Sequence, residues 1–386
     1  MQSVRVNRKA AARLATGHPW VYSSDLIDAR NLEPGAVTAV TDPSGRSLGV
    51  AHYSASSLIA LRLLDRGRPA VDASFFRKRI EAAAELRRRR VRDSDAYRLV
   101  HAEADQLPGL IIDRYGGHFV LQALTQGMNA VQPWVVEALA GIFQPSSIVA
   151  RNDAAVREKE DLPRTVEVIH GALDAPVELS MNGLRWRADL LHGQKTGVFL
   201  DQRENYLAVR AYAQGRALDC FTCTGGFALH LASVCESVEA IDSSASALAT
   251  AHWNRQANGV ANVTFREADL FQILAAFSSS RRSYDTVILD PPALTKSRAT
   301  LDSAAHAYRE LNARALRLLS SGGILVSCSC SHHMSEVALL AAIAAACQET
   351  NRSLRVLERR GQSQDHPVLL AVPETGYLKC LIFEVQ

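Results

Sequence analysis

Residues 217–231 read A-L-D-C-F-T-C-T-G-G-F-A-L-H-L, and this stretch decides the fold of the C-terminal half of the chain. A short apolar run ends at Asp219, a loop of small residues with Gly225 and Gly226 follows, and apolar residues then recur at helical spacing. This order predicts a strand, a tight turn and a helix start, the first unit of a doubly wound α/β domain. The turn is neither G-x-G-x-x-G nor a lysine-bearing phosphate loop, so a dinucleotide or ATP is not its natural ligand.

Length and composition limit the classes of protein that the chain can belong to. With 386 residues, two or three domains are expected, and 47% apolar residues supply more than one core. No run of about 18 apolar residues occurs and the N-terminus lacks a signal-peptide core, so we expect a soluble, cytoplasmic protein without a membrane partner. The seven cysteines follow no regular spacing, which favours reduced thiols over a disulfide framework.

Positive charge is local in this sequence, because the net charge is only +3. The densest basic segment covers residues 75–92, F-F-R-K-R-I-E-A-A-A-E-L-R-R-R-R-V-R. Two interpretations stay open at this point. The segment is either the solvated face of a surface helix or a face that contacts nucleic-acid phosphates.

Three segments differ in their patterns. Residues 1–70 carry turn signals between short alternating runs and predict a small β-rich domain. Residues 71–187 mix helical and strand patterns and predict a small α+β domain. Residues 188–386 alternate strands with helices, which is typical of a parallel sheet, and the last two strands are expected to pair as an antiparallel hairpin. This is the seven-stranded, Rossmann-like architecture of class I S-adenosylmethionine (SAM) methyltransferases. The strands expected in the third segment are 216–221, 237–241, 262–266, 284–289, 323–328, 354–359 and 377–384, and the helices 203–213, 226–234, 244–258, 303–320 and 334–348.

Acidic residues follow three successive strands of this predicted sheet. Ligands of open α/β sheets bind at the carboxyl ends of the strands. There Asp242 suits the hydroxyls of a ribose, and Asp269 is placed to accept from an adenine amino group. Each acid alone could cap a helix or stop a strand, but together, beside a Gly-Gly turn, they indicate a nucleoside-like cofactor, and we predict SAM. The predicted pocket contains Asp219, Thr224, Gly225, Gly226, Asp242 and Asp269.

The fourth and fifth strands end in D-P-P at residues 290–292 and S-C-S at residues 329–331. These groups suit methylation of a pyrimidine at carbon 5. Carbon 5 of cytosine is a poor nucleophile, so an enzyme first adds a thiolate at carbon 6, and Asp290 is the candidate for protonating or hydrogen-bonding N3. After methyl transfer a base removes the carbon 5 proton and the thiolate leaves. A helix expected from about Met334 would stabilise the thiolate.

Two cysteines compete for the role of nucleophile. Cys328 falls inside the predicted strand, where a free cysteine is usually a buried filler, whereas Cys330 lies just past the strand end. Cys330 is therefore the predicted nucleophile. The same cysteines with His332 and His333 prompt a metal interpretation, but no second ligand pair at zinc spacing supports it, so we predict no metal.

Residues 192–203, H-G-Q-K-T-G-V-F-L-D-Q-R, precede a predicted helix. This segment is either a lid over the cofactor, with Phe199 or Lys195 near the sulfonium and the base, or a plain surface loop.

The chain resembles the bacterial 23S rRNA 5-methylcytidine methyltransferases of the RlmI type, which have a PUA domain, a central domain and a Rossmann-like methyltransferase domain. The similarity runs nearly from end to end. The motifs that carry it are H-P-W-V at 18–21, D-x-L-P-G-x-x-I-D-R at 105–114, H-G-x-K-T-G at 192–197, L-D-Q-R at 200–203, C-F-x-x-T-G-G-F-A at 220–228, D-P-P at 290–292, S-C-S at 329–331, D-H-P-V at 365–368 and Y-L-K at 377–379.

The resemblance implies specific roles. Residues 1–70 would bind RNA, the nucleophile position maps to Cys330, and Phe221 and Gln202 join the cofactor pocket. Ala293 follows D-P-P, so the second cysteine of the eukaryotic-type RNA cytosine methyltransferases is absent and product release proceeds without it. The roles of Cys328, His332 and His333 stay open. The residues expected to contact RNA are Arg8, Lys9, Arg87, Arg88 and Lys195.

The predicted function is SAM-dependent methylation of carbon 5 of a cytidine in 23S rRNA, with naked rRNA or the large ribosomal subunit as partner and a homodimer left open. Two alternatives remain. One is another methyl acceptor, such as uridine at carbon 5 or a different base. The other is a non-catalytic protein that binds SAM and RNA.

Overall fold

A computed structural model describes residues 1–28, 32–174, 176–193, 198–280, 282–295 and 298–386. Contacts divide the chain into two compact units, which are described separately. Unit 1 contains Met1–Ser180, Ala188–Val198 and Gln364–Thr375, and unit 2 contains Met181–Arg187, Phe199–Ser363 and Gly376–Gln386. The finer division at residues 70 and 187 stays a prediction.

The N-terminal part of unit 1 is a six-stranded sheet in the order β2-β6-β5-β4-β1-β3. Its strands confirm the expected β-rich domain. The helix α1 (Arg8–Ala15) was not foreseen; it begins after Asn7, whose side chain accepts a hydrogen bond from the Ala10 amide. The strands are β1 (Ser3–Val6), β2 (Trp20–Tyr22), β3 (Leu26–Asp28), β4 (Val37–Thr41), β5 (Ser47–Tyr53) and β6 (Ile59–Asp65).

A second sheet of unit 1 has the order β11-β10-β9-β8-β7. β8 and β9 form the antiparallel hairpin that the glycine turn between them predicts. The strands are β7 (Ala96–His101), β8 (Leu110–Tyr115), β9 (His118–Ala123), β10 (Ser147–Asn152) and β11 (Thr165–Gly171), and the helices are α2 (Ala73–Arg90), α3 (Gln126–Ala130) and α4 (Gln132–Phe143). Mixed helices and strands confirm the α+β character of this segment.

Unit 2 is built on a seven-stranded sheet in the order β16-β15-β14-β17-β18-β20-β19. The first five strands of this order pair in parallel, and β20 pairs antiparallel with both β18 and β19. The predicted sheet with its antiparallel C-terminal hairpin is therefore confirmed. The strands are β14 (Arg216–Cys220), β15 (Ser237–Asp242), β16 (Val263–Glu267), β17 (Tyr284–Leu289), β18 (Leu319–Ser329), β19 (Leu354–Arg360) and β20 (Lys379–Val385).

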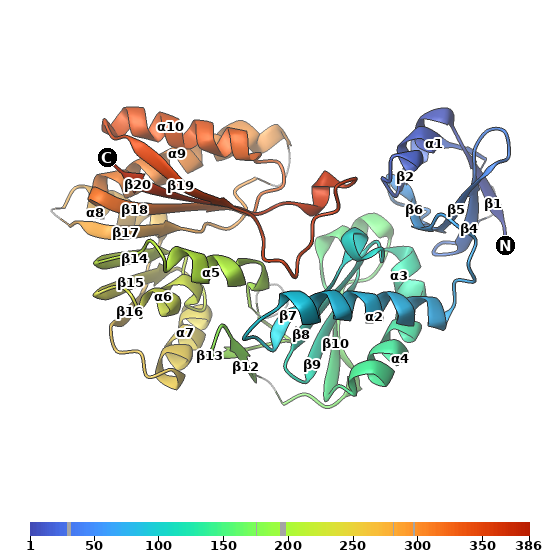
Figure 1. Ribbon diagram of the computed structural model, residues 1–386, viewed down its shortest axis with the longest axis horizontal. Coiled ribbons are helices and arrows are strands. Elements are labelled where there is room, and N and C mark those ends of the chain that lie inside the picture. Colours follow the sequence, from blue (N-terminus) through green and yellow to red (C-terminus); the bar gives the residue numbers. More distant parts are fainter. Residues whose placement is uncertain (29–31, 175, 194–197, 281, 296–297) are drawn as a thin grey trace. The chain divides into compact units, whose positions relative to one another are not determined.

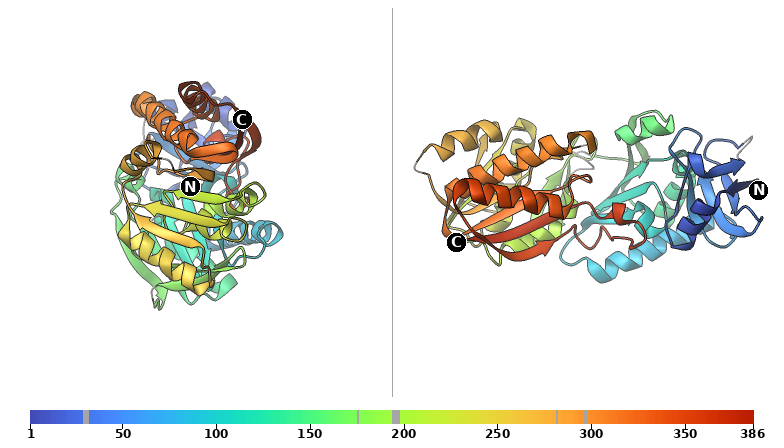
Figure 2. Two further views of the ribbon diagram at one scale, coloured as in Figure 1. Left: turned by 90° about the vertical axis from the view of Figure 1, so that its left-hand side faces the viewer. Right: turned by 90° about the horizontal axis from the view of Figure 1, so that it is seen from above.

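Helices cover both faces of this sheet, as Figures 1 and 2 show. α5, α6 and α7 lie on one face, and α8, α9 and α10 on the other. α8 was not among the predicted helices, and β18 starts four residues earlier than expected because α9 ends directly before it. The helices are α5 (Arg203–Val209), α6 (Gly226–Leu231), α7 (Ala245–Ala257), α8 (Leu270–Ser278), α9 (Leu301–Leu318) and α10 (Glu336–Thr350).

The main core of unit 2 lies between the sheet and α8, α9 and α10. Leu218, Val287 and Leu325 are fully buried there, from three adjacent parallel strands. Strands buried on both faces read as apolar runs, which is why the sequence pattern located them.

A short hairpin, β12 (Val177–Met181) and β13 (Leu184–Ala188), forms a separate two-stranded sheet. It confirms the strand-turn-strand prediction around Asn182-Gly183.

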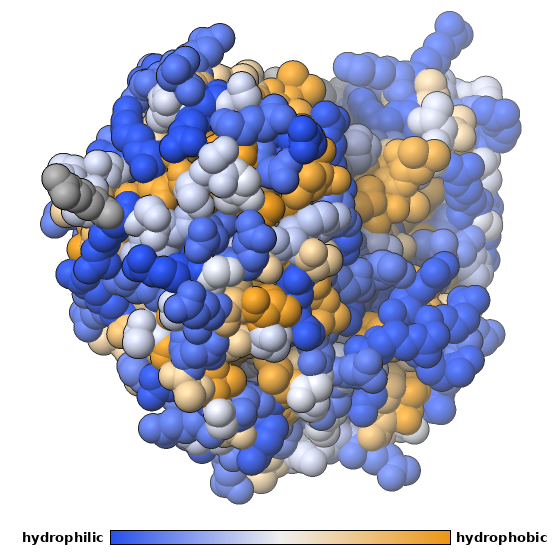
Figure 3. Space-filling model, turned by 60° about the vertical axis from the view of Figure 1, so that its left-hand side comes forward, coloured by the Kyte–Doolittle hydropathy of each residue, from blue (hydrophilic) through white to orange (hydrophobic). Residues whose placement is uncertain are grey.

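Hydrophilic residues cover most of the face seen in Figure 3, with apolar residues in scattered patches, as is usual for a surface in water. Among the described residues, no helix combines the length and apolar character that crossing a membrane requires.

Candidate active site

Asp219 is the central acid of the predicted cofactor site, and it is fully buried at the end of β14. One carboxylate oxygen, Oδ2, accepts hydrogen bonds from the Thr222 hydroxyl at 2.6 Å and the Ala228 amide at 2.9 Å. The other oxygen, Oδ1, is buried and has no hydrogen-bond partner among the described residues. Burial raises the pKa of Asp219 to about 7, although the two hydrogen bonds act to lower it. The negative charges of Asp290 and Asp242 also raise this pKa.

The loop after β14 has an unusual backbone. Phe221, Cys223 and Gly225 all have positive φ angles, of 64°, 50° and 91°. Only glycine adopts such angles without cost, so two non-glycine residues in this region store backbone strain, which is concentrated at functional sites in proteins. The loop is thereby folded back on the strand end, with its amide groups directed to fixed partners.

Asp242, at the end of β15, holds this loop in place. Its Oδ2 accepts from the Cys223 amide at 2.8 Å, and its Oδ1 accepts from the Ser244 amide at 2.9 Å. The alternative that Asp242 caps the next helix is not seen, because Ser244 is the N-cap of α7. On the other side of the loop, the Thr224 carbonyl accepts a hydrogen bond from Asn254 at 3.0 Å.

Gly226 is required by the packing of the loop. A Cβ atom at this position would lie 2.5 Å from the Tyr206 ring, far inside normal contact distance. The ring of Tyr206 packs edge-on against Phe227 with ring centroids 4.8 Å apart. The second glycine of the G-G pair is therefore fixed by close approach to an aromatic side chain of α5.

Asp269 is exposed at the start of α8 and acts as its N-cap, accepting from the Gln272 amide at 2.9 Å. This is the simpler of the two interpretations of that residue. The role toward an adenine amino group stays a prediction for Asp269. Phe221, also predicted for the pocket, is half-buried and packs edge-on against Phe271 of α8.

Asp290 directly follows β17, and its side chain is oriented by a chain of polar groups. Gln202 donates to its Oδ2 at 3.1 Å, Asn205 donates to the Gln202 amide oxygen at 2.6 Å, and Arg360 donates to Asn205 at 2.8 Å. The Asp290 amide is 3.4 Å from the Cys220 carbonyl, which joins the ends of β17 and β14. Gln202 was predicted in the cofactor pocket, and the structure places it against Asp290.

The two candidate cysteines differ as predicted in their positions. Cys328 lies within β18, is fully buried and pairs with Cys380 of β20, and burial raises its pKa well above the usual value. Cys330 follows the last residue of β18 and is half-buried. Because β17 and β18 are parallel neighbours, Asp290 and Cys330 follow adjacent strand ends.

Two residues beside Cys330 were missed as site residues. Tyr308 of α9 donates a hydrogen bond to the Ser329 hydroxyl at 2.8 Å, and burial raises the pKa of Tyr308 to about 12. Lys379, at the start of β20, donates to the carbonyl of Ser331 at 2.7 Å. The Y-L-K motif was the sequence signal for Lys379.

The predicted start of the helix near Met334 is corrected by the structure. The helix α10 begins at Glu336, after the N-cap residue Ser335.

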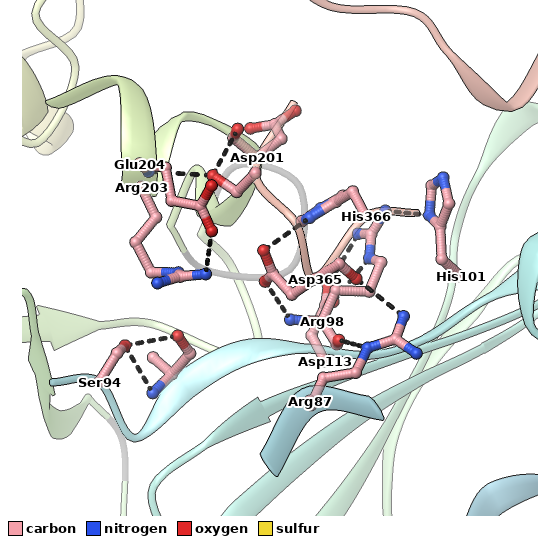
Figure 4. A network of polar contacts seen from close by, with 12 residues as sticks. Arg87, Ser94, Arg98, His101, Asp113, Asp201, Arg203, Glu204, Asp365 and His366 are labelled. Carbon is pink, nitrogen blue, oxygen red and sulfur yellow. Dashed lines mark hydrogen bonds and ion pairs between the residues drawn. The ribbon is translucent and has the colours of Figure 1, made fainter. Parts of the chain in front are cut away.

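The prediction that Arg87 contacts RNA is wrong. Its side chain is fully buried and forms an ion pair with Asp105, with guanidinium–carboxylate distances of 2.5 and 2.7 Å. It also donates to the carbonyls of Arg98 and Asp365, both within unit 1 (Figure 4). Spacing explains the error, because Arg87 continues the buried stripe of α2 formed by Phe76, Ile80 and Ala83.

The other predicted RNA contacts lie at the surface or outside the described residues. Arg8 and Lys9 are exposed at the start of α1. Arg88 is exposed and pairs with Glu85 one turn earlier on α2. Residues 194–197, which include Lys195, fall outside the described residues, and the lid expected for residues 192–203 stays a prediction.

Comparison with known families agrees with this geometry. A model of PUA-like domains matches residues 4–66, and a model of S-adenosylmethionine-dependent methyltransferases matches residues 156–384. The fold and the site thus define a SAM-dependent methyltransferase that carries an N-terminal PUA-like domain.

Curated relatives of known name identify the family within this class of methyltransferases. The chain is 36% identical over 378 residues to the ribosomal RNA large subunit methyltransferase I of Shewanella denitrificans, covering 95% of each chain. It is also 36% identical over 371 residues to the protein of the same name from Erwinia tasmaniensis, covering 94% of each. The chain belongs to the family of ribosomal RNA large subunit methyltransferase I, which confirms the resemblance seen in its motifs.

Solved structures share the fold over the whole chain. One is a protein from Streptococcus mutans assigned as a SAM-dependent methyltransferase, with a TM-score of 0.84 and 19% identity. Another is assigned as a methyltransferase and is complexed with SAH, with a TM-score of 0.86 and 19% identity. Each covers 100% of both chains.

The residues of this chain fit the cofactor that the family implies. SAM carries a positive sulfonium and polar groups on its amino-acid and ribose parts. Asp219 offers a buried carboxylate oxygen with no other hydrogen-bond partner among the described residues, and Asp242 and Asp290 lie close enough to raise its pKa. Carboxylates that lie close together repel one another, so a cationic ligand between them is bound favourably.

Proposed function

We propose that this protein methylates carbon 5 of a cytidine in 23S rRNA through a covalent adduct between Cys330 and carbon 6 of the base. The observation that carries the proposal is the placement of Asp290 and Cys330 after adjacent parallel strands, beside the loop that Asp219 and Asp242 hold. This placement combines a nucleophile with an acid that is already oriented by Gln202.

The first step is attack of the Cys330 thiolate on carbon 6. The π electron pair between carbons 5 and 6 moves to carbon 5, which becomes a nucleophile. Asp290 supports this shift by hydrogen-bonding or protonating N3, so that negative charge does not build up on the ring. Cys328 takes no part, because it is buried within β18.

SAM supplies the methyl group as an electrophile when it is bound. Asp219, Thr224 and the two glycines of the loop would hold it, with Asp242 at its ribose and Asp269 at its adenine. Transfer leaves a proton on carbon 5. A base removes this proton, and the electron pair re-forms the double bond as the Cys330 sulfur leaves carbon 6.

The RNA substrate is inferred from the family. The named relatives act on large-subunit ribosomal RNA, and the PUA-like domain with the exposed Arg8 and Lys9 of α1 is the surface that we assign to RNA contact. Action in the cytoplasm is part of this proposal. The homodimer stays a prediction, which light scattering of the purified protein tests.

The experiment incubates the protein with SAM and with rRNA from cells that lack it, and then analyses the nucleosides by mass spectrometry. Cys330→Ala is compared with Cys328→Ala as its matched control. New 5-methylcytidine that Cys330→Ala abolishes and Cys328→Ala retains supports the proposal. Methylation that survives Cys330→Ala, or that occurs on another base, overturns it. Assembled large subunits are tested in parallel with naked rRNA.

A further inference from the structure

Lys379 is a charged residue beside Cys330 that the function proposed above does not use. It is the first residue of β20 and lies opposite Ser329 in the antiparallel pairing of β20 with β18. Its ammonium group donates hydrogen bonds to the carbonyls of Ser331 at 2.7 Å and Tyr377 at 2.8 Å. Lys379 is therefore paired with the residue before Cys330 and hydrogen-bonded to the residue after it.

The charge state of this lysine matters for Cys330. Burial lowers the pKa of Lys379 to about 8, while the nearby Cys330 and Glu336 act to raise it. The ammonium form still predominates at pH 7, because this pKa lies above 7. Electrostatic coupling is reciprocal, so a thiolate at Cys330 that stabilises the ammonium is stabilised by it to the same extent.

Among the described residues, the other titratable groups near Cys330 are acids, a phenol, a thiol and a histidine. Asp290 after β17 is an acid, which opposes a thiolate, and Glu336 at the start of α10 is ion-paired with Arg359 across 3.3 Å. Burial raises the pKa of Tyr308 to about 12, so this phenol stays neutral. Cys328 also stays a neutral thiol, because burial raises its pKa well above the usual value. His332 is exposed, and its ring lies 5.3 Å from that of Tyr377.

We propose that Lys379 is the cation that holds Cys330 in its thiolate form. The inference rests on the proposed function, in which Cys330 attacks carbon 6. The Cys330 proton passes to solvent before the attack, and Lys379 keeps its own protons throughout. The sulfur electron pair forms the bond to carbon 6 and returns to sulfur when that bond breaks, again beside the ammonium.

The test measures the pH dependence of Cys330 alkylation by iodoacetamide in the whole protein, with the peptide that contains Cys330 quantified by mass spectrometry. This readout is independent of methylation. An opposite charge at close range typically shifts a midpoint by about one to three pH units. Lys379→Met is therefore expected to move the midpoint of alkylation up by about one unit or more. Lys379→Arg keeps the charge and should leave it near the wild-type value.

Two further variants keep the result interpretable. Lys379→Gln keeps a polar side chain that can donate to the Ser331 carbonyl but removes the charge, so it is expected to move the midpoint up even if Lys379→Met folds poorly. Lys78→Met, at an exposed position of α2, is the matched control and should have no effect.

An unchanged midpoint in Lys379→Met overturns the role of Lys379, even if Cys330→Ala abolishes methylation and the proposed function stands. Conversely, an upward shift in Lys379→Met together with methylation that survives Cys330→Ala would leave the ion pair in place and remove the proposed function. The two ideas can therefore fail separately.

Discussion

The amide nitrogen of Gln202 donates a hydrogen bond to the carboxylate of Asp290 across 3.1 Å. This contact is the last in a chain that runs from Arg360 through Asn205, with distances of 2.8 and 2.6 Å. Gln202 and Asn205 are both buried. Through this contact the chain restricts rotation of the Asp290 carboxylate and fixes its plane.

Replacing Gln202 by Met removes this contact while keeping the side-chain volume. We expect kcat to fall by up to about 100-fold, because general acid–base catalysis typically contributes about 10²- to 10⁴-fold and Asp290 loses the partner that orients it. The KM for SAM should change much less if Gln202 acts through Asp290. Steady-state methylation assays measure both. Gln272→Met, on the exposed side of α8, is the control, and equal kcat values for the two variants would contradict the role given to Gln202.

The strand ends could be predicted because buried parallel strands read as short apolar runs. Asp219, Asp242, Asp290 and Cys330 were all located in this way, and the structure places each at or just after the end of its strand. The parallel sheet followed from the α/β alternation, and the antiparallel pairing of the last two strands from the missing helical period before β20. Local pattern was sufficient for these features.

The supporting residues could not be predicted by the same means. Arg360 and Lys379 reach the site from elements more than a hundred residues away from Gln202 and Asp219, and no periodicity links such positions. Arg87 shows the opposite error. Its charge suggested a surface role, whereas its position four residues after Ala83 places it on the buried face of α2, where Asp105 neutralises it.

Gly226→Ala tests the close approach of the loop to Tyr206. The added Cβ would lie 2.5 Å from the Tyr206 ring, so the ring or the loop must move. Overpacking of this kind typically costs about 1–3 kcal/mol of unfolding free energy, and displacement of the loop should also weaken SAM binding. Urea denaturation and calorimetry measure the two effects. Gly361→Ala, whose Cβ would be 3.6 Å from its nearest neighbour, should change neither; if both variants behave alike, the packing argument fails.

Arg87→Met and Arg88→Met separate a buried arginine from an exposed one on the same helix. The first substitution leaves Asp105 as an uncompensated buried charge, which typically costs about 3–5 kcal/mol of unfolding free energy. The second should leave the urea midpoint unchanged, because Arg88 is exposed. A stable Arg87→Met protein would show that the ion pair contributes little to folding.

The buried side chain of His52 leads us to expect that the free energy of unfolding falls in acid. The imidazole is fully buried, both ring nitrogens lack a hydrogen-bond partner among the described residues, and burial lowers its pKa to about 4. The unfolded chain takes up a proton below pH 6.5, but the folded chain does so only near pH 4. Stability is therefore full above pH 6.5 and falls by up to about 3 kcal/mol as the pH drops to 4.

Urea denaturation between pH 7 and pH 4 measures this slope, and His52→Leu should make it shallower. Other buried histidines contribute to the total, so the difference between the two proteins is the informative quantity. His170→Leu, at a position where the ring is only partly buried, serves as the comparison. Identical slopes for wild type and His52→Leu would rule out this assignment.

Asp219 predicts that SAM binding depends on pH near neutrality. Because burial raises its pKa to about 7, this carboxyl is partly protonated in the free protein at pH 7. A cationic ligand favours the deprotonated form, whose population falls as the pH drops below 7. The Kd for SAM is therefore expected to rise roughly fivefold to tenfold between pH 7.5 and pH 6. Calorimetric titrations across this range measure the change.

The variant Asp219→Asn has no carboxyl group to titrate at this position. It should therefore bind SAM more weakly at pH 7.5 and lose most of the pH dependence, while any ionisation of SAM itself persists in both proteins. A pH dependence that is the same in Asp219→Asn as in the wild type would show that another group controls binding.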